Sequence, residues 1–228
     1  MAKKIIEELK APIYNIGTVV CASLLYLASM LFFAAMIYAK AFAEILGIPS
    51  MGELIQIVCF SVSLLSFIFG LGCLAQYAER AAARDKHDCL KFSAGLRVLA
   101  MLIPVTIVYA SIRFIPGNSI IYWFFFAFMA ICLPAVIIRA AVNDSIKAGL
   151  HAFSAVITRA YITRLALSLV ISMAYSLLAF AITQALAYAG TASTTAYYIT
   201  AALGLLVYVI LLCSACMTSI SLLANVVE

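Results

Sequence analysis

The chain has 228 residues, of which 67% are hydrophobic and only 10% are charged, and its mean hydropathy is +1.18. A soluble globular domain carries roughly 25% charged residues and about 45–50% apolar ones. The composition therefore excludes a soluble globular domain, a disordered chain and a disulfide-stapled secreted domain. It predicts an all-α fold, a polytopic transmembrane helical bundle that forms one membrane domain over residues 1–228.

The N-terminal segment, residues 1–13, is predicted to be amphipathic. Its apolar face is formed by Ile5, Ile6, Leu9 and Ile13, and Pro12 is expected to interrupt the helix before the first span. The apolar stretch that follows is longer than the roughly 7–15 residues of a signal-peptide core. We therefore expect this first span to be retained rather than cleaved.

Six apolar windows predict membrane-spanning helices, because a helix needs about 20 mostly apolar residues to cross a bilayer. In chain order they cover residues 16–39, 54–77, 98–112, 120–138, 165–189 and 196–224, the third being the shortest. The connections between the third and fourth windows and between the fifth and sixth are short. These pairs are therefore expected to be antiparallel neighbours in a bundle built from hairpins.

The basic residues predict the orientation of the bundle. Of the 14 Lys and Arg residues, 12 lie before the first span or in the stretches that follow the second and fourth spans. By the positive-inside rule, these segments and both termini are cytoplasmic. The formal net charge of +5 is therefore interpreted as a topology signal that suits an anionic bilayer surface. It is not taken to indicate a nucleic-acid partner.

The stretch after the fourth span is a candidate docking surface. Asn143, Asp144 and Ser145 are favourable helix starters, and an apolar stripe then recurs at helical spacing through Ile146, Leu150, Phe153, Ile157 and Tyr161. Such a helix either packs on its own bundle or docks a protein partner at the membrane surface. Arg80 and Arg139, which begin the two basic loops, are included as candidate docking residues.

The spans themselves carry little chemistry. Their central portions contain no Asp, Glu, Lys, Arg or His, which disfavours an ion-coupled transporter. Lys40 and Glu44 are spaced as a surface ion pair. The two histidines, His87 and His151, lie outside the spans, and the cluster between Asp85 and Cys89 lacks a second pair of metal ligands. We therefore predict no catalytic residues, no metal, no cofactor and no enzymatic activity.

Small residues within the spans are candidate helix-packing positions. Ala35 and Ala39 form a small-xxx-small pair in the first span, and Gly70 and Gly72 permit close approach in the second. Small side chains let membrane helices pack tightly. The contact that they serve is either internal to the chain or an interface with a partner or a second copy.

The fourth span, its loop and the fifth span resemble a loosely defined group of six-span bacterial inner-membrane proteins. The resemblance rests on Pro134, Arg139, the amphipathic stretch 145–153, and Arg159 and Arg164 before a Leu-rich span. The group includes the YciC-like proteins and the membrane domain found beside some glycerophosphodiester phosphodiesterases. The resemblance implies a location in the bacterial inner membrane and a scaffold or accessory role, without assigning a function to any residue.

Three functions are compatible with the sequence. The first is a non-enzymatic scaffold or accessory subunit that docks protein partners, or forms a homo-oligomer, through its amphipathic cytoplasmic segments. The alternative is the membrane subunit or substrate-capture component of a transporter; because the sequence contains no ATP-binding motif, a separate cytosolic ATPase would energise it. Ala35 and Ala39 would then suit docking to the transport module. The third, an intramembrane enzyme acting on lipids, lacks a catalytic set.

Overall fold

The computed structural model describes residues 2–81, 92–112, 120–143, 145–152, 156 and 158–227. Within these ranges the chain is helical apart from short connections, and no β-strand occurs. The α-helices are α1 (Ala2–Leu9), α2 (Ala11–Tyr14), α3 (Ile16–Ile45), α4 (Gly52–Ala81), α5 (Phe92–Ile112), α6 (Ile120–Val142), α7 (Ile146–Leu150), α9 (Arg159–Ala189) and α10 (Thr194–Val227). Two short 3-10 helices, η1 (Pro49–Met51) and η2 (Gly190–Ala192), complete the described elements. The predicted all-α class is confirmed.

Five helices are long and apolar enough to cross a membrane: α3, α4, α6, α9 and α10. They contain the predicted windows 16–39, 54–77, 120–138, 165–189 and 196–224. The window 98–112 lies within α5, whose apolar part is the shorter stretch Phe92–Pro104. A sixth span therefore stays a prediction, whereas a multi-pass membrane protein is supported by the five long helices.

The long helices extend beyond the windows that predicted them. Helix α4 continues past residue 77 to Ala81, and α9 begins at Arg159 rather than at residue 165. Hydropathy detects only the part of a helix that suits hydrocarbon. Backbone hydrogen bonding continues into the polar boundary, where Arg and Lys side chains reach water.

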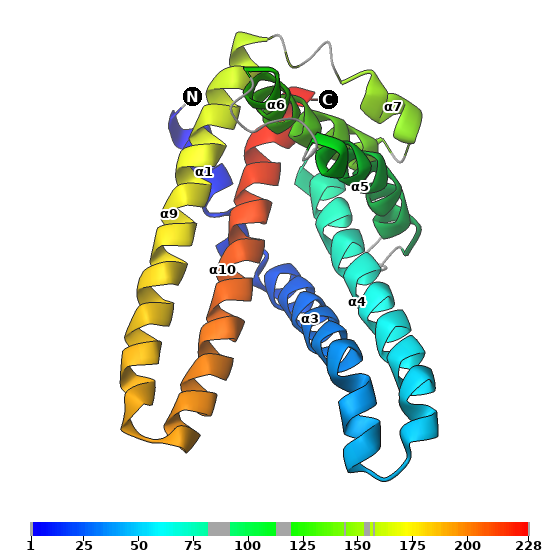
Figure 1. Cartoon of the computed structure of the whole chain (residues 1–228). Coiled ribbons are helices and arrows are strands. Elements are labelled where there is room, and N and C mark those ends of the chain that lie inside the picture. Colours follow the sequence, from blue (N-terminus) through cyan, green and yellow to red (C-terminus); the bar gives the residue numbers. More distant parts are fainter. Residues whose placement is uncertain are drawn as a thin grey trace.

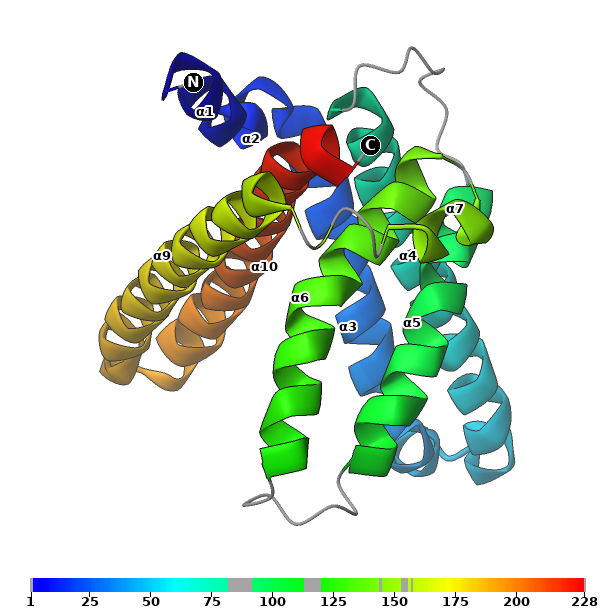
Figure 2. The same cartoon turned by 90° about the horizontal axis from the view of Figure 1, so that it is seen from above.

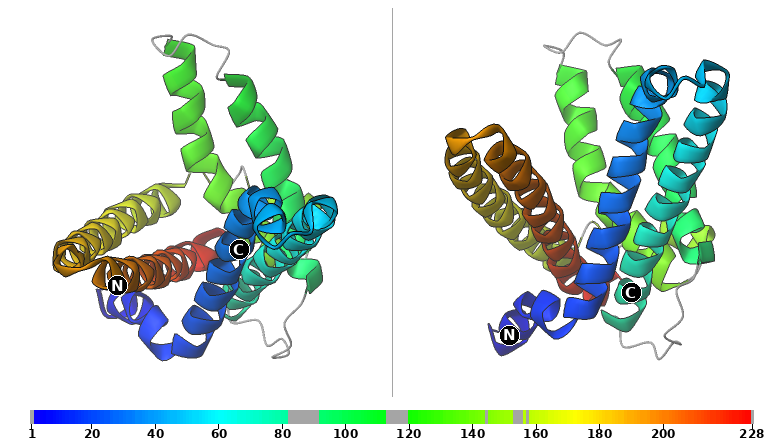
Figure 3. Two further views of the ribbon diagram at one scale, coloured as in Figure 1. Left: turned by 60° about the horizontal axis from the view of Figure 1, so that its bottom comes forward. Right: turned by 90° about the horizontal axis from the view of Figure 1, so that it is seen from below.

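Three helical hairpins, α3–α4, α5–α6 and α9–α10, diverge from a common end of the molecule (Figures 1–3). Both termini lie at this end, which we call the terminal end. Few of the residues in the five spans are buried inside the molecule. Their outward apolar side chains are suited to lipid, because lipid contact avoids the hydration cost that the same surface would meet in water.

The α3–α4 hairpin is closed by a Schellman turn. Gly47, with φ of +74°, follows the C-cap residue of α3. Its N–H donates to the Glu44 carbonyl at 3.0 Å, and the Ile48 N–H donates to the Ala43 carbonyl at 2.9 Å. Glycine suits this position because it adopts the left-handed conformation without a Cβ penalty.

The cross-turn ion pair differs from the prediction. Lys40 Nζ lies 3.8 Å from Glu53 Oε1, across the turn, and both side chains are exposed. The predicted pairing of Lys40 with Glu44 is therefore wrong. The turn places Lys40 beside the first turn of α4, where the carboxylate of Glu53 is also favoured by the helix dipole.

The core of the molecule lies at the terminal end, where all three hairpins contribute buried side chains. One buried cluster joins α4, α5, α6, α9 and α10 and includes Leu71, Val98, Ala135, Leu165 and Leu223. A second cluster, which includes Val19, Tyr77 and Met217, joins α3, α4 and α10. The hairpins are therefore held together mainly at this end.

Small residues bring the helices close together within the chain. A Cβ added to Gly95 of α5 would lie 2.0 Å from the Ile68 carbonyl oxygen and 2.9 Å from the Gly72 nitrogen of α4. A Cβ on Gly70 would meet the Tyr26 ring of α3 at 3.1 Å. The predicted packing glycines, Gly70 and Gly72, therefore serve internal contacts.

The predicted alanine pair is also used inside the chain. Ala39 is 1% exposed, whereas Ala35 is half-buried. Helix α3 packs against α4 along the hairpin, and at its far end Ala43 is fully buried near Gly52. Ala39 is thus buried within the chain, and the docking of this pair to a transport module stays a prediction.

The N-terminal segment forms two helices rather than one. Helix α1 ends at Leu9, and Pro12 lies in the first turn of α2, where its missing N–H is tolerated. Ile6 and Ile13 are exposed, while Glu8 is buried. Two residues of the predicted apolar face, Ile6 and Ile13, are therefore directed outward, where they suit a bilayer surface, whereas Leu9 is half-buried. The Glu8 carboxylate is directed into the protein.

The predicted continuous helix from residue 146 to residue 161 is wrong. Helix α7 ends at Leu150, and Thr158 has an extended backbone that caps α9 by accepting a hydrogen bond from the Tyr161 N–H. Ser145 stands at the N-cap position of α7, as expected, although its side chain makes no capping bond. Tyr161 belongs to α9, and its hydroxyl donates to the Ile131 carbonyl of α6 at 2.6 Å.

Candidate functional site

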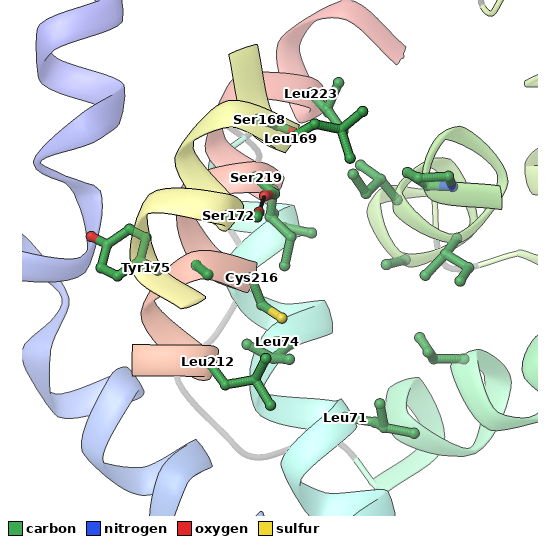
Figure 4. A pocket seen from close by; sticks show the side chains of 18 of the residues that line it. Leu71, Leu74, Ser168, Leu169, Ser172, Tyr175, Leu212, Cys216, Ser219 and Leu223 are labelled. Carbon is green, nitrogen blue, oxygen red and sulfur yellow. Dashed lines mark hydrogen bonds between the residues drawn. The ribbon is translucent and has the colours of Figure 1, made fainter. Parts of the chain in front are cut away.

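An apolar cavity of about 410 Å³ lies between the α9–α10 hairpin and helices α4, α5 and α6 (Figure 4). Most of its lining is aliphatic, with leucines contributed by several helices. Those labelled in Figure 4 are Leu71, Leu74, Leu169, Leu212 and Leu223. Among the described lining residues there is no Asp, Glu, Lys, Arg or His. Such a lining is suited to an uncharged, apolar ligand.

Hydroxyl groups form a polar strip on one wall of this cavity. Ser168, Ser172 and Ser176 recur every four residues along α9, which places them on one helix face. The Ser172 hydroxyl lies 3.3 Å from the Ser219 hydroxyl of α10 (Figure 4). Hydroxyls both donate and accept hydrogen bonds. The strip therefore offers a small polar anchor within an otherwise apolar site.

Helix α6 supplies the opposite wall beside Pro134. Proline lacks an N–H and disturbs the carbonyl four residues earlier, here that of Ala130. Both residues line the cavity. In the same turn, the Ile131 carbonyl accepts the hydrogen bond from Tyr161. This bond fixes the start of α9 against α6 and so sets the distance between the two walls.

A second, polar pocket of about 330 Å³ lies at the terminal end, between α1, α2, α4 and α10. Its polar lining consists of Glu7, Glu8, Tyr14, Asn15, Tyr77, Arg80 and Ser221. The Tyr77 and Ser221 hydroxyls hydrogen-bond to each other. This polar pocket is separated from the apolar cavity by α4 and α10, which line one site with one face and the other site with another.

A buried ion pair borders the polar pocket. Arg164 Nη1 donates to Glu8 Oε1 at 2.9 Å and to the Leu222 carbonyl at 2.8 Å. The side chains of Glu8 and Arg164 are only 8% and 14% exposed. The other carboxylate oxygen of Glu8, Oε2, is buried and has no hydrogen-bond partner. The pair joins α1 to α9 and α10 and leaves one strong acceptor unused.

The predicted docking residues are distributed over different surroundings. Ile146 and Leu150 are 43% and 57% exposed on α7. Arg80 is exposed and lines the polar pocket. Arg139 is half-buried, and its Nη1 donates to the His151 carbonyl at 3.3 Å. Arg139 therefore serves an internal contact after α7. Phe153 and Ile157 lie outside the described residues.

Helix α7 is anchored closely to the bundle. A Cβ added to Gly149 would lie 2.8 Å from the Ala140 Cβ, the Met101 methyl carbon and the Val136 carbonyl oxygen. Glycine thus allows α7 to lie directly on α6 and α5. Ile146 and Leu150 are exposed on this fixed helix.

No metal centre is identified in the part of the chain that the structure describes. Within it, no group of three or more His, Cys, Asp or Glu residues is arranged to hold a metal ion. The sequence cluster from Asp85 to Cys89 lies outside the described residues.

Sequence reasoning missed the residues that define both sites. The four-residue spacing of Ser168, Ser172 and Ser176 is visible in the sequence and could have indicated a polar helix face. The pairing of Glu8 with Arg164 has no local signal, because the two residues are 156 positions apart.

Comparison of the chain with protein-family models, characterised proteins and solved structures finds no match. The resemblance to YciC-like proteins therefore stays a prediction.

Proposed function

We propose that the protein binds a neutral, largely apolar molecule within the membrane, as the substrate-capture component or membrane subunit of a transporter. The apolar cavity is the observation that supports this function. Its volume of about 410 Å³ falls within the roughly 300–1,000 Å³ of small-molecule sites. Its helical walls come from α4, α5, α6, α9 and α10.

The chemistry of the lining defines the ligand class. Aliphatic side chains favour a hydrocarbon body, and the absence of ionisable groups among the described lining residues disfavours a charged one. The Ser172 and Ser219 hydroxyls favour a single hydroxyl, carbonyl or ether group as the polar end. A long-chain alcohol or an isoprenoid-like molecule has this composition.

The proposed topology places six spans in a bacterial inner membrane, with both termini in the cytoplasm. Helix α5 contributes the sixth span, since its 21 residues extend about 31 Å at 1.5 Å per residue. The basic residues of the sequence support the orientation. Because the sequence contains no ATP-binding motif, the energy for transport would come from a separate cytosolic ATPase.

A scaffold role is the second candidate, and α7 favours it. Ile146 and Leu150 are exposed apolar side chains on a helix that Gly149 holds against the bundle. A fixed apolar pair at a membrane surface is suited to docking a protein partner or a second copy. Replacing both with Glu would abolish that docking while leaving the apolar cavity intact.

Photolabelling of the purified full chain tests the ligand proposal. The probe is a long-chain fatty alcohol that carries a diazirine, and labelled peptides are mapped by mass spectrometry. We expect labelling of α9 and α10 that excess unmodified alcohol competes away. Ser172→Phe should reduce it strongly, because the ring replaces the hydroxyl and occupies part of the cavity, whereas Ser61→Phe, at an exposed position of α4, should leave it unchanged. Labelling that is not competed, or that Ser172→Phe leaves unchanged, would contradict the proposal.

Purification in mild detergent distinguishes the two candidate functions. Co-purification of an ATPase would support the transport role and weaken the scaffold role. A chain that purifies without an ATPase and without a bound small molecule would argue against both transport variants.

A further inference from the structure

The polar pocket at the terminal end contains an acceptor that the protein itself does not use. Glu8 is 8% exposed, and its Oε2 has no hydrogen-bond partner, although Oε1 is paired with Arg164. A buried carboxylate oxygen without a donor is costly. Glu8 lines the pocket, so a rotation of its carboxylate that brings this buried oxygen to the pocket surface would let a ligand with N–H donors satisfy it.

The charges around the pocket have both signs. Glu7 and Glu8 line it together with Arg80, and Arg164 neutralises part of the charge of Glu8 from behind. A ligand with only a positive charge would be repelled by Arg80, and a ligand with only a negative charge would be repelled by the two carboxylates. A zwitterion matches this arrangement, with its positive group at the glutamates and its negative group at the guanidinium. Arg is well suited to bind phosphate.

The side chains around the pocket are suited to a membrane surface. Ile13, Tyr14 and Ile16, which lie beside it at the junction of α2 and α3, are each at least 66% exposed. Exposed aliphatic and aromatic side chains next to charged groups are typical of the boundary between headgroups and hydrocarbon. This position favours a lipid headgroup over a dissolved metabolite as the source of the zwitterion.

We propose that the polar pocket binds the phosphoethanolamine headgroup of a membrane lipid. The primary ammonium donates to Glu8 Oε2, and the phosphate lies beside Arg80. The volume of about 330 Å³ is at the lower end of small-molecule sites, as a headgroup requires. This site is independent of the apolar cavity, because the two lie against different faces of α4 and α10.

The decisive comparison is between two lipids that differ only in N–H donors. Phosphatidylethanolamine and phosphatidylcholine have the same net charge, but the quaternary ammonium of choline donates no hydrogen bond. The full chain in detergent is titrated with each dioleoyl lipid and followed by native mass spectrometry. We expect phosphatidylethanolamine to bind about tenfold more tightly, as one charge-assisted hydrogen bond allows. Equal binding of the two lipids would overturn the proposal.

Variants test the two halves of the site separately. Glu8→Gln should remove the preference for ethanolamine over choline. Arg80→Gln should weaken both lipids by a similar factor, because they share the phosphate, and should preserve the ratio. Lys40→Gln, at the far end of the molecule, serves as the control and should change neither value. If Glu8→Gln does not fold, Arg80→Gln and the wild-type ratio still decide the question.

Competition identifies the source of the headgroup. Soluble phosphoethanolamine lacks acyl chains, so we expect it to displace the lipid only at a large excess. Displacement at a concentration equal to that of the lipid would contradict a membrane lipid as the ligand. Failure of the proposed transport function would leave all these outcomes unchanged, since they do not involve the apolar cavity.

Discussion

Arg164 of α9 pairs with Glu8 of α1 at 2.9 Å, and the same nitrogen donates to the Leu222 carbonyl of α10. One guanidinium therefore fastens the N-terminal segment to the last hairpin. The exposed pair of Lys40 and Glu53 at the far end lies in a setting where ion pairs contribute little. The two pairs are chemically similar, so their surroundings determine their effects on stability.

Breaking the buried pair is expected to destabilise the protein strongly. Arg164→Met leaves the Glu8 carboxylate buried without compensation, which costs about 3–5 kcal/mol. The double variant Glu8→Met with Arg164→Met should recover part of this loss, since an apolar pair often replaces a buried ion pair. Thermal unfolding in mild detergent, followed by circular dichroism, measures both. Lys40→Met is the control, with an expected change of about 0–1 kcal/mol. Equal instability of the single and double variants would contradict the prediction.

Gly95 is expected to be the most sensitive glycine to substitution. A methyl group there would meet the Ile68 carbonyl oxygen at 2.0 Å, and backbone cannot move aside as a side chain does. Gly95→Ala should destabilise the protein by about 3 kcal/mol, at the upper end of overpacking costs. In contrast, Gly17→Ala meets nothing within 4 Å and should stabilise α3 by about 0.5–1 kcal/mol. The unfolding midpoint of Gly95→Ala should therefore lie below that of Gly17→Ala. The reverse order would contradict the close crossing of α4 and α5.

The contact between α3 and α4 can be tested by oxidation. The sulfur atoms of Cys21 and Cys73 lie 3.7 Å apart, and a disulfide needs them at about 2.05 Å. A membrane-permeant oxidant such as iodine should therefore link these two residues. Peptide mapping by mass spectrometry should detect the linked pair. Cys21→Ser should abolish it, while Cys59→Ser should leave it unchanged; a link to another cysteine would show that α3 is placed differently.

The proposed orientation predicts which residues are reached from outside the cell. Ser50, in the turn of the first hairpin, and Lys10, near the N-terminus, are both exposed. An impermeant maleimide applied to intact cells should label Ser50→Cys and not Lys10→Cys, which should react only after permeabilisation. The reverse pattern would overturn the orientation. Cys89, the native thiol expected on the cytoplasmic side, lies outside the described residues and provides a second probe.

Local patterns predicted the elements better than the contacts between them. The spans could be predicted because each is recognised by its own apolar composition, whichever helices surround it. Lys40 shows the limit of this reasoning: Glu44 is the nearer residue in sequence, but the turn brings Glu53 within reach. The predicted continuous helix from Ile146 to Tyr161 was wrong for the same reason, because Tyr161 hydrogen-bonds to α6, a contact that the local pattern does not show.

The sites were harder to predict than the fold, since each combines side chains from several helices. The serine strip of α9 has a recognisable period, but only the packing of α10 against it brings Ser219 beside Ser172. Glu8 belongs to a segment whose pattern indicates an amphipathic helix, and the pattern does not show which polar residue is buried. Its partner, Arg164, looks like one more basic residue at the end of a span.

The apolar cavity lies between the spanning helices, in the part of the bundle nearer the terminal end. A molecule that occupies it would arrive by diffusion within the bilayer. Its occupancy would then follow the mole fraction of ligand in the lipid, not the aqueous concentration. Adding empty lipid to a fixed amount of protein and ligand would lower the occupancy by simple dilution in two dimensions, so any affinity measured for this protein must be expressed per lipid.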